Sequence, residues 1–544
     1  MYSLRDRNLS AIHLTVLFII GGLSVTSSAH AGLFDDSVSG ETSASADVTA
    51  ETGAETGGDG EGTVEGGDDA AASTEGPAPT VVERIVEKSG LAFDLNGHIR
   101  GDLFVGKMPD YSRAETKSGY GELALKFLVS KGSYGNAFAD LRFQAGYLAD
   151  EHYLGQPSDR PSQGTDIGEF HTRLKLREAY VNAYVGPLDI RFGKQIIVWG
   201  RADGINPTNQ LTPIDLRIRS PEEDDRRLGN WALRANLNFN PVRIEGVWVP
   251  MYSPSYFPVI DVPDPVRFLE PDYPSFDLAK GTVAARLHLL FPAFEASFSY
   301  IHGYAPQPGL DFVGTNFSSL SSDSDDPIVY IRRAAYEQHL AGFDFSTSIA
   351  GQLGVRGEIA FRYPVDYKNL VYAPRPDLYY VFGLDREFGP VSIIAQYIGR
   401  YVLDDLQDPE NPLDFMNPPV NLDNLADQTA TALRGLPSET VRGVAMYELA
   451  PINRLINGQQ EKVQHGVSAR FEWKTLHDTL SLVCFGMVNI STLELVLYPK
   501  LVYSITDAMT LSVGAEIYWG DDDTLFNYIE EVLSAGYTEL KISF

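Results

Sequence analysis

Strict alternation of apolar and polar residues constrains the fold of this chain most, and it is clearest at the C-terminus. In an extended Tyr537–Phe544 segment, one face would carry Thr538, Leu540, Ile542 and Phe544, and the other Glu539, Lys541 and Ser543. Successive side chains of a strand point to opposite faces, so the two faces of this segment meet different environments. The C-terminus is therefore predicted to be a strand between an apolar and a polar medium.

The same alternation starts at Leu91 and recurs along the rest of the chain. The predicted strands lie near 93–105, 122–130, 139–147, 173–185, 188–200, 229–240, 242–251, 279–290, 293–303, 328–346, 352–363, 376–387, 390–403, 464–474, 478–489, 492–505, 508–519 and 535–544. Short turns such as Gly186-Pro187 and Gly389-Pro390 close every second strand onto the next, and mostly long polar connections lie between these hairpins. We expect an all-β fold, an antiparallel barrel of about 18 strands with about 16 as the alternative.

Composition supports this fold and excludes several others. Past the N-terminus no apolar run is long enough for a spanning helix, which needs about 18 or more residues. The net charge is -30, so the chain lacks the excess of basic residues that is typical of a nucleic-acid-binding protein. Cys484 is the only cysteine, which excludes an intrachain disulfide and a c-type haem site. An aromatic girdle at strand ends is the expected place of the tryptophans Trp199, Trp231, Trp248, Trp473 and Trp519, with a core position as the alternative for one or two of them.

The pattern of the N-terminal part predicts an export signal followed by a spacer. Arg5 and Arg7 precede an apolar stretch and the sequence Ala29-His30-Ala31, which predicts a signal peptide over 1–31. Residues 32–80 contain 12 acidic residues and no Lys or Arg, so 32–90 is predicted to be a disordered acidic spacer. It would be a solvated periplasmic tether, or a docking arm for a periplasmic partner or for peptidoglycan. The barrel is assigned to 91–544.

Charged residues recur on the polar faces of the predicted strands. A charge facing lipid costs a few kcal/mol, so these side chains should point into the lumen. The predicted pore-lining residues are Arg100, Arg142, Arg173, Lys175, Arg177, Arg234, Arg243, Arg286, Arg356, Arg362, Arg470, Glu122, Asp140, Glu358 and Glu472. Two interpretations stay open for the arginines: ion pairs with neighbouring strands, or a ladder that favours anionic solutes.

Two long connections are candidates for a constriction of the pore. The loop after residue 200 is densely charged and could fold into the lumen, or stay outside as an ion-paired extracellular loop. Its candidate constriction residues are Asp203, Asn206, Arg217, Arg219, Arg226 and Arg227. The connection over 403–463 is too long to be structureless, and its mild helical periodicity over 421–436 and 438–449 makes it a second candidate.

Two stretches carry a resemblance to known families. The final strand ending in Phe544 resembles the C-terminal signal of Gram-negative outer-membrane β-barrels. The segment 191–200, followed by Asn206-Pro207, resembles porin-like outer-membrane barrels of uncharacterised families and is loosely similar to alginate-export-type barrels. The resemblance implies an outer-membrane location in a Gram-negative bacterium, with lipid around the barrel and solutes inside it. The side with the short turns is expected to face the periplasm, where both termini would then lie.

Enzyme signatures are absent from the sequence. The histidines have no metal-ligand spacing, and neither a G-x-S-x-G nor a phosphate-binding glycine loop occurs. We therefore expect no enzymatic activity, metal or cofactor. The predicted function is a porin-like channel that passes small solutes, anionic ones among them, passively. One alternative is a barrel that sheathes an electron-transfer or export complex, and another is an outer-membrane hydrolase. The sequence leaves the oligomeric state open.

Overall fold

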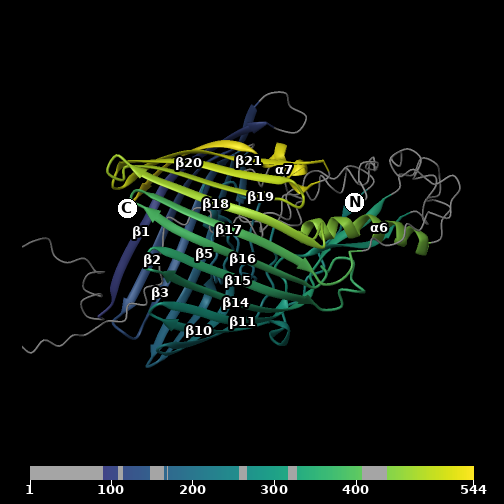
Figure 1. Ribbon diagram of the computed structural model, residues 1–544, viewed down its shortest axis with the longest axis horizontal. Coiled ribbons are helices and arrows are strands. Elements are labelled where there is room, and N and C mark those ends of the chain that lie inside the picture. The colour runs from purple at the N-terminus through teal and green to yellow at the C-terminus, as the bar shows by residue number, and fades with distance from the viewer. Residues whose placement is uncertain are drawn as a thin grey trace, which may run out of the picture.

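The computed structural model describes residues 90–107, 114–147, 164–167, 170–256, 266–316, 328–406, 438–522 and 524–544. The predicted signal peptide and all but the last residue of the predicted spacer lie outside these residues. The described chain forms one closed antiparallel barrel of 18 strands, which confirms the predicted fold class and strand number (Figure 1). The first and last strands, β1 and β22, pair with each other and close the wall.

The wall consists of strands that follow each other in chain order. They are β1 (Ala92–Lys107), β2 (Ala114–Lys131), β3 (Gly135–Tyr147), β5 (Phe170–Val185), β6 (Leu188–Gln195), β7 (Asn230–Phe239), β8 (Val242–Val249), β10 (Thr282–Phe291), β11 (Phe294–Tyr304), β14 (Glu337–Ile349), β15 (Leu353–Pro364), β16 (Asp377–Phe388), β17 (Val391–Val402), β18 (Val463–Thr475), β19 (Leu480–Asn489), β20 (Glu494–Thr506), β21 (Met509–Gly520) and β22 (Ala535–Ser543). A short strand, β4 (Gly164–Ile167), pairs with β5.

Smaller elements lie in the connections between hairpins. A separate sheet contains β9 (Val266–Phe268), β12 (Gly309–Thr315) and β13 (Val329–Ala334). The helices are α6 (Ser438–Ile456) and α7 (Leu525–Leu533), with 3-10 turns η2 (Glu223–Arg226) and η3 (Leu278–Lys280). No helix in the described part of the chain is long and apolar enough to cross a membrane.

Each predicted strand segment contains one wall strand, and the predicted short turns all lie at one end of the barrel. Three segments were bounded wrongly. The segment 122–130 covers only the second half of β2, which begins at Ala114. The segment 188–200 is a strand only to Gln195, where the chain turns into the barrel. The segment 328–346 is divided between β13 and β14, and only β14 belongs to the wall. Alternation alone cannot detect such a break, because both pieces are extended.

The C-terminal residue takes part in closing the barrel. The backbone N–H groups of Gly97 and Phe544 each donate to the carbonyl oxygen of the other residue at 2.9 Å. A Cβ atom at residue 97 would lie 2.8 Å from the Phe544 ring, so the close approach of the ring requires glycine. The predicted pairing of the last strand with 93–105 is confirmed.

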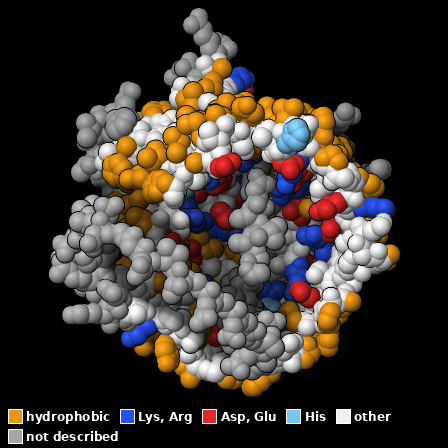
Figure 2. Space-filling view, turned by 90° about the vertical axis from the view of Figure 1, so that its left-hand side faces the viewer, with side chains coloured by type: hydrophobic (Ala, Val, Ile, Leu, Met, Phe, Trp, Pro, Cys, Tyr) orange, Lys and Arg blue, Asp and Glu red, His pale blue; other side chains and the backbone are white. Residues whose placement is uncertain are grey.

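The two faces of the wall have opposite character. On β1, the outward side chains Phe93, Leu95 and Ile99 are each more than half exposed, whereas the inward Arg100 is 2% exposed. Figure 2 looks into the short-turn end and shows acidic and basic side chains inside a rim of hydrophobic ones. Trp231, Trp248, Trp473 and Trp519 lie on outward positions of their strands. Trp199 takes the alternative, core position: it is inside the barrel, 1% exposed, and donates to Glu245 at 3.1 Å.

An apolar core lies inside the barrel, contributed by the wall, the small sheet and both helices. Leu449 and Ile452 of α6 and Phe526 of α7 belong to it, with Phe485 and Val496 of the wall. The predicted helix over 438–449 is present and extends to Ile456, whereas the candidate helix 421–436 lies outside the described residues. Helix α7 was not predicted. Lys117 of β2 donates to the carbonyl oxygens of Glu531, Val532 and Ser534 at its C-terminal end.

Candidate functional site

Residues 196–229, here called the inner loop, leave the end of β6 and lie inside the barrel. Here the backbone groups form hydrogen bonds with side chains instead of with a neighbouring strand. The Ile196 N–H donates to Glu178 at 2.8 Å, and the Ile197 N–H donates to the Thr212 hydroxyl at 3.0 Å. The Thr212 hydroxyl in turn donates to the Ile197 carbonyl at 2.6 Å. This local pairing folds the inner loop back on itself directly after β6.

The first half of the inner loop is held by β14 and β15. Glu358 of β15 accepts hydrogen bonds from the Thr208 N–H at 2.7 Å, the Thr208 hydroxyl at 2.8 Å and the Arg201 N–H at 3.0 Å. The Arg201 guanidinium binds Asp344 of β14 at 2.8 Å and contacts Glu295. Asp344 is fully buried and also binds Arg286 at 2.8 Å. Charge-assisted hydrogen bonds to groups this buried hold the backbone in a defined position.

The second half of the inner loop is held by β1 and β3, on another side of the wall. Asp225 binds Arg100 of β1 at 2.6 Å and contacts Arg142 of β3. Burial alone would raise the pKa of the Asp225 carboxyl, but Arg100 and Arg142 outweigh it and hold the pKa well below its usual range. Arg100 also binds Glu122 at 3.0 Å and Asp102 at 3.3 Å. One buried arginine therefore connects the inner loop to the wall.

A third set of anchors comes from the last two strands. Glu516 of β21 accepts from Arg226 at 2.7 Å and from Arg219 at 3.0 Å. Lys541 of β22 binds Glu222 of the inner loop at 2.6 Å. Since its partners lie on β1, β3, β14, β15, β21 and β22, the inner loop spans the interior of the barrel from one side to the other.

The predicted constriction residues are in this loop, and the structure places each of them. Asp203 lies 3.6 Å from Arg470 of β18, and Asn206 is 8% exposed. Arg219 and Arg226 reach the wall as described. Two arginines instead pair within the loop. Arg217 binds Asp215 at 2.9 Å, and Arg227 binds Asp224 at 2.7 Å. The loop therefore contains ion pairs between its own residues as well as residues that bind the wall.

The predicted pore-lining residues lie on the inner face, mostly in ion pairs between or along strands. The pairs are Arg142–Asp140 at 3.2 Å, Arg177–Asp140 at 3.6 Å, Arg234–Glu245 at 2.9 Å, Arg356–Asp385 at 2.7 Å, Arg362–Asp377 at 2.7 Å and Lys474–Glu472 at 3.1 Å. Arg173 and Lys175 lie on the same face of β5, and Arg243 on that of β8. These contacts are of the kind that the ion-pair interpretation describes.

Several residues of the site were not among the predicted ones. Asp225 and Arg201 were in the charged loop, but the sequence does not show which wall strands they reach. Asp344 and Glu516 occupy inward positions of predicted strands, so the alternation that identified Arg100 could also have identified them. The alternation does place Lys541 on the polar face of the last strand, but not its contact with the inner loop. Within the described residues, no group of three or more His, Cys, Asp or Glu is arranged to hold a metal ion.

Comparisons with known proteins give distant similarities. Residues 12–260, just under half of the chain, match the family "Protein of unknown function (DUF1302)". No curated protein matches the sequence.

Among solved structures, the chain is similar to OpdK, an outer membrane protein of Pseudomonas aeruginosa, at 9% identity and a TM-score of 0.46, covering 83% of this chain and 98% of that one. A BenF-like porin from Pseudomonas fluorescens Pf-5 gives 9% and 0.44 over the same shares. OccAB3 of Acinetobacter baumannii gives 10% and 0.43, again over the same shares. Similarities this low leave the function to be argued from the geometry of the chain itself.

Proposed function

We propose that this chain is an outer-membrane channel for the passive passage of small solutes. The support for a membrane location is the inverted wall, with exposed aromatic and aliphatic side chains outside and buried charges inside. An outer surface this apolar is unfavourable in water. In lipid, only a helix or a closed barrel satisfies all of its own backbone hydrogen bonds. The short-turn end would face the periplasm, with the spacer 32–90 as a tether there. The long connections would then face the exterior.

The observation that carries the channel function is the path of the inner loop. A barrel of this strand number encloses more space than wall side chains fill. Here a loop from the wall crosses that space at the height of Arg100, in the middle of β1, and is fixed by ion pairs on several sides. A rigid charged segment at this place narrows the lumen and sets the size and charge of what passes.

One column of basic residues supports a preference for anions. Arg173, Lys175 and Arg177 lie on one face of β5, and Arg177 donates to the carbonyl oxygen of Asp224 in the inner loop at 2.6 Å. A basic column beside the constriction lowers the energy of an anion there. We therefore propose that small anions, carboxylates among them, pass more readily than cations of the same size.

The channel itself is tested by planar-bilayer recording of the purified protein. We expect discrete conductance steps in a simple salt such as KCl, because a barrel of this strand number leaves an aqueous channel and charged groups line the wall around the inner loop. Protein unfolded by boiling in detergent is the control. Absence of steps from protein whose β-sheet spectrum is intact would contradict the channel function.

Reversing the basic column should reverse part of the selectivity. In the double variant Arg173→Glu with Lys175→Glu, the anion-to-cation permeability ratio in a KCl gradient should fall roughly 2- to 5-fold, since partly screened charges contribute about 1 kcal/mol. Arg386→Glu is the matched control, because Arg386 is exposed and outside the lumen, over the Phe388 ring. An unchanged ratio in the double variant would show that the column does not select ions.

A further inference from the structure

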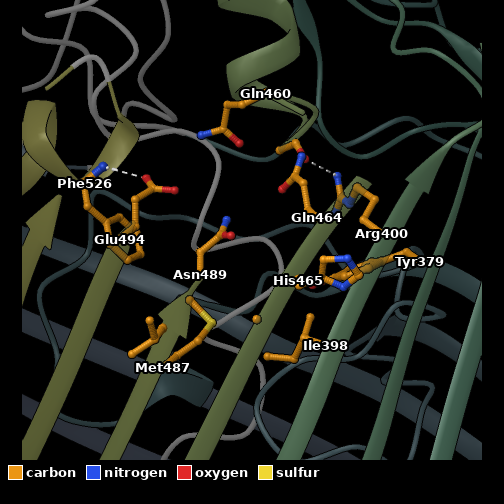
Figure 3. A pocket seen from close by; sticks show the side chains of 13 residues that line it. Tyr379, Ile398, Arg400, Gln460, Gln464, His465, Met487, Asn489, Glu494 and Phe526 are labelled. Carbon is orange, nitrogen blue, oxygen red and sulfur yellow. Dashed lines mark hydrogen bonds between the residues drawn. The ribbon is translucent and has the colours of Figure 1, made fainter. Parts of the chain in front are cut away.

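A cavity of about 80 Å³ lies at the long-loop end of the barrel, next to the residues that follow helix α6 (Figure 3). Residues 457–460, here called the post-helix turn, contribute Gly458 and Gln460 to its lining. Figure 3 shows Gln460 on one side of the space and the inward wall residues Ile398 and Met487 on the other. The chain after α6 therefore borders this space on the side of the long loops.

A smaller cavity of about 30 Å³ adjoins the first one. The side chains of Arg400 and Tyr379 line both cavities, so they stand between the two spaces. The smaller cavity is also lined by Asn457 of the post-helix turn and by Pro207 and Gln210 of the inner loop. Arg400 and the post-helix turn thus separate the larger cavity from the space beside the inner loop.

The post-helix turn is bound by side chains from four consecutive wall strands. The carbonyl oxygen of Gly458 accepts hydrogen bonds at 2.7 Å and 3.1 Å, and the Gln459 amide donates one at 2.9 Å. The wall residues that bind the turn are Arg362 of β15, Asp377 of β16, Arg400 of β17 and Gln464 of β18. Among the described residues, no backbone hydrogen bond joins the turn to a wall strand. The turn can therefore leave the wall without breaking the sheet.

Arg400 differs from the inward arginines of the neighbouring strands, which pair with carboxylates. It donates to the carbonyl oxygens of Asn457 and Gly458, directly after the C-terminal end of α6. Within the described part of the chain, the one carboxylate within 4 Å is Asp377, which is 3.7 Å away and is bound by Arg362 at 2.7 Å. Since Arg400 is only 9% exposed, water compensates little of its charge. A hydrogen bond to an anion is stronger than one to a carbonyl oxygen, so an anion would bind this guanidinium in preference.

The acidic group of the larger cavity is engaged elsewhere. Glu494 accepts a hydrogen bond at 3.0 Å from the N–H group of Phe526, in the first turn of α7, and also contacts the Thr492 hydroxyl. The positive end of the helix compensates its negative charge. Figure 3 shows Glu494 and Arg400 on opposite sides of the space. The carboxylate of Glu494 therefore leaves the side of the cavity next to Arg400 open to an anion.

We propose that the post-helix turn is a second gate of the channel, held shut by Arg400, and that an anionic group of the solute opens it by binding Arg400 in place of the two carbonyl oxygens. The inference rests on the channel function proposed above. A cavity of roughly 150 Å³ holds benzene, so the cavity of about 80 Å³ takes about half of such a ring, which is enough for a carboxylate group. The rest of the solute enters only when the turn has moved. Arg400 lies on β17, across the barrel from the basic column on β5, so the ions of a simple salt that follow that column do not need this gate.

Movement of the post-helix turn is measured by the reactivity of a cysteine placed in it. The starting protein carries Cys484→Ala, which removes the only cysteine, and Gln460→Cys, which puts a thiol beside the cavity. The probe is N-ethylmaleimide, which is uncharged, and the sample is the full-length protein in lipid nanodiscs. Replacing chloride by acetate at equal ionic strength and pH should raise the modification rate several-fold, because acetate binds Arg400 and releases the turn. Equal rates in acetate and in chloride would overturn the proposal.

The added substitution Arg400→Met should open the gate without any anion. The modification rate in chloride should then rise about 10-fold, the equivalent of one hydrogen bond to a charged group, and acetate should have no further effect. Arg442→Met is the matched control, because Arg442 is exposed on α6, and it should change neither rate. An acetate effect that persists in Arg400→Met would refute the role of Arg400. If Arg400→Met fails to fold, the acetate response of the starting protein still decides whether an anion moves the turn.

Bilayer conductance of the same preparations separates the two proposals. Conduction without an effect of acetate on the modification rate overturns the gate alone, and an effect of acetate without conduction overturns the channel alone.

Discussion

Replacing Arg100 with methionine should lower the free energy of unfolding by roughly 3–5 kcal/mol, the range observed when one partner of a buried ion pair is removed. The Arg100 side chain is fully buried and lies within 3.5 Å of Asp102, Glu122, Asp225 and Glu539. Without the guanidinium, these carboxylates would face each other in a water-poor site. Each would then have to be protonated or rehydrated, at a cost in folding free energy.

The measurement is reversible urea unfolding in lipid vesicles, followed by the fluorescence of the five tryptophans. Arg243→Met is the matched control, because Arg243 has the same inward orientation but its Nε makes no hydrogen bond among the described residues. If Arg100→Met fails to fold, adding Asp225→Asn should restore part of the stability by removing one uncompensated charge. Equal stabilities of Arg100→Met and Arg243→Met would contradict the role of the cluster.

Removing the inner loop should raise the single-channel conductance severalfold. Gln195 at the end of β6 and Asn230 at the start of β7 are paired neighbours, so a short glycine-serine turn can replace 197–228 without straining the wall. The pore would then lose its narrowest charged segment, and ion selectivity should weaken together with the rise in conductance. Planar-bilayer recording measures both quantities in one experiment.

The control for this deletion shortens a different connection. Asn316 and Ile328 are also joined, by a backbone hydrogen bond of 3.2 Å, and replacing 318–326 by a turn leaves the inner loop intact. That variant should conduct like the unmodified protein. A loop-deleted barrel with unchanged conductance would mean that passage is limited somewhere other than at residues 196–229.

The sequence predicts the wall well because one physical rule governs it. A strand between lipid and a charged interior must alternate, and residues such as Phe93 and Arg100 therefore reveal both the strand and its faces. Trp199 violates the expectation since it follows the break at Gln195, where alternation no longer applies. Helix α7 had a detectable signal, with Thr524 as N-cap and apolar Leu525, Ile529 and Leu533 on one side, but its short length hides it between two strands.

The inner loop could be located in the sequence but its path could not. Its contacts join residues far apart in the chain, as in Arg226 with Glu516 and Asp225 with Arg100. Inward charges of both signs are spread over many wall strands, so many pairings satisfy the composition equally. Only the closed geometry decides which carboxylate lies opposite which guanidinium, and no local pattern encodes that choice.

The seam between β1 and β22 has a consequence for the order of assembly. The inner loop is synthesised long before β22, yet Glu222 binds Lys541 on that strand, and Arg100 on β1 lies between Asp225 and Glu539. Until β22 pairs with β1, Glu222 lacks its contact with Lys541 and Arg100 lacks its contact with Glu539. The two edges of the sheet also stay unpaired. The pairing of β22 with β1 and the binding of the inner loop inside the barrel are therefore coupled steps. A barrel with a completed seam therefore already holds its inner loop in place.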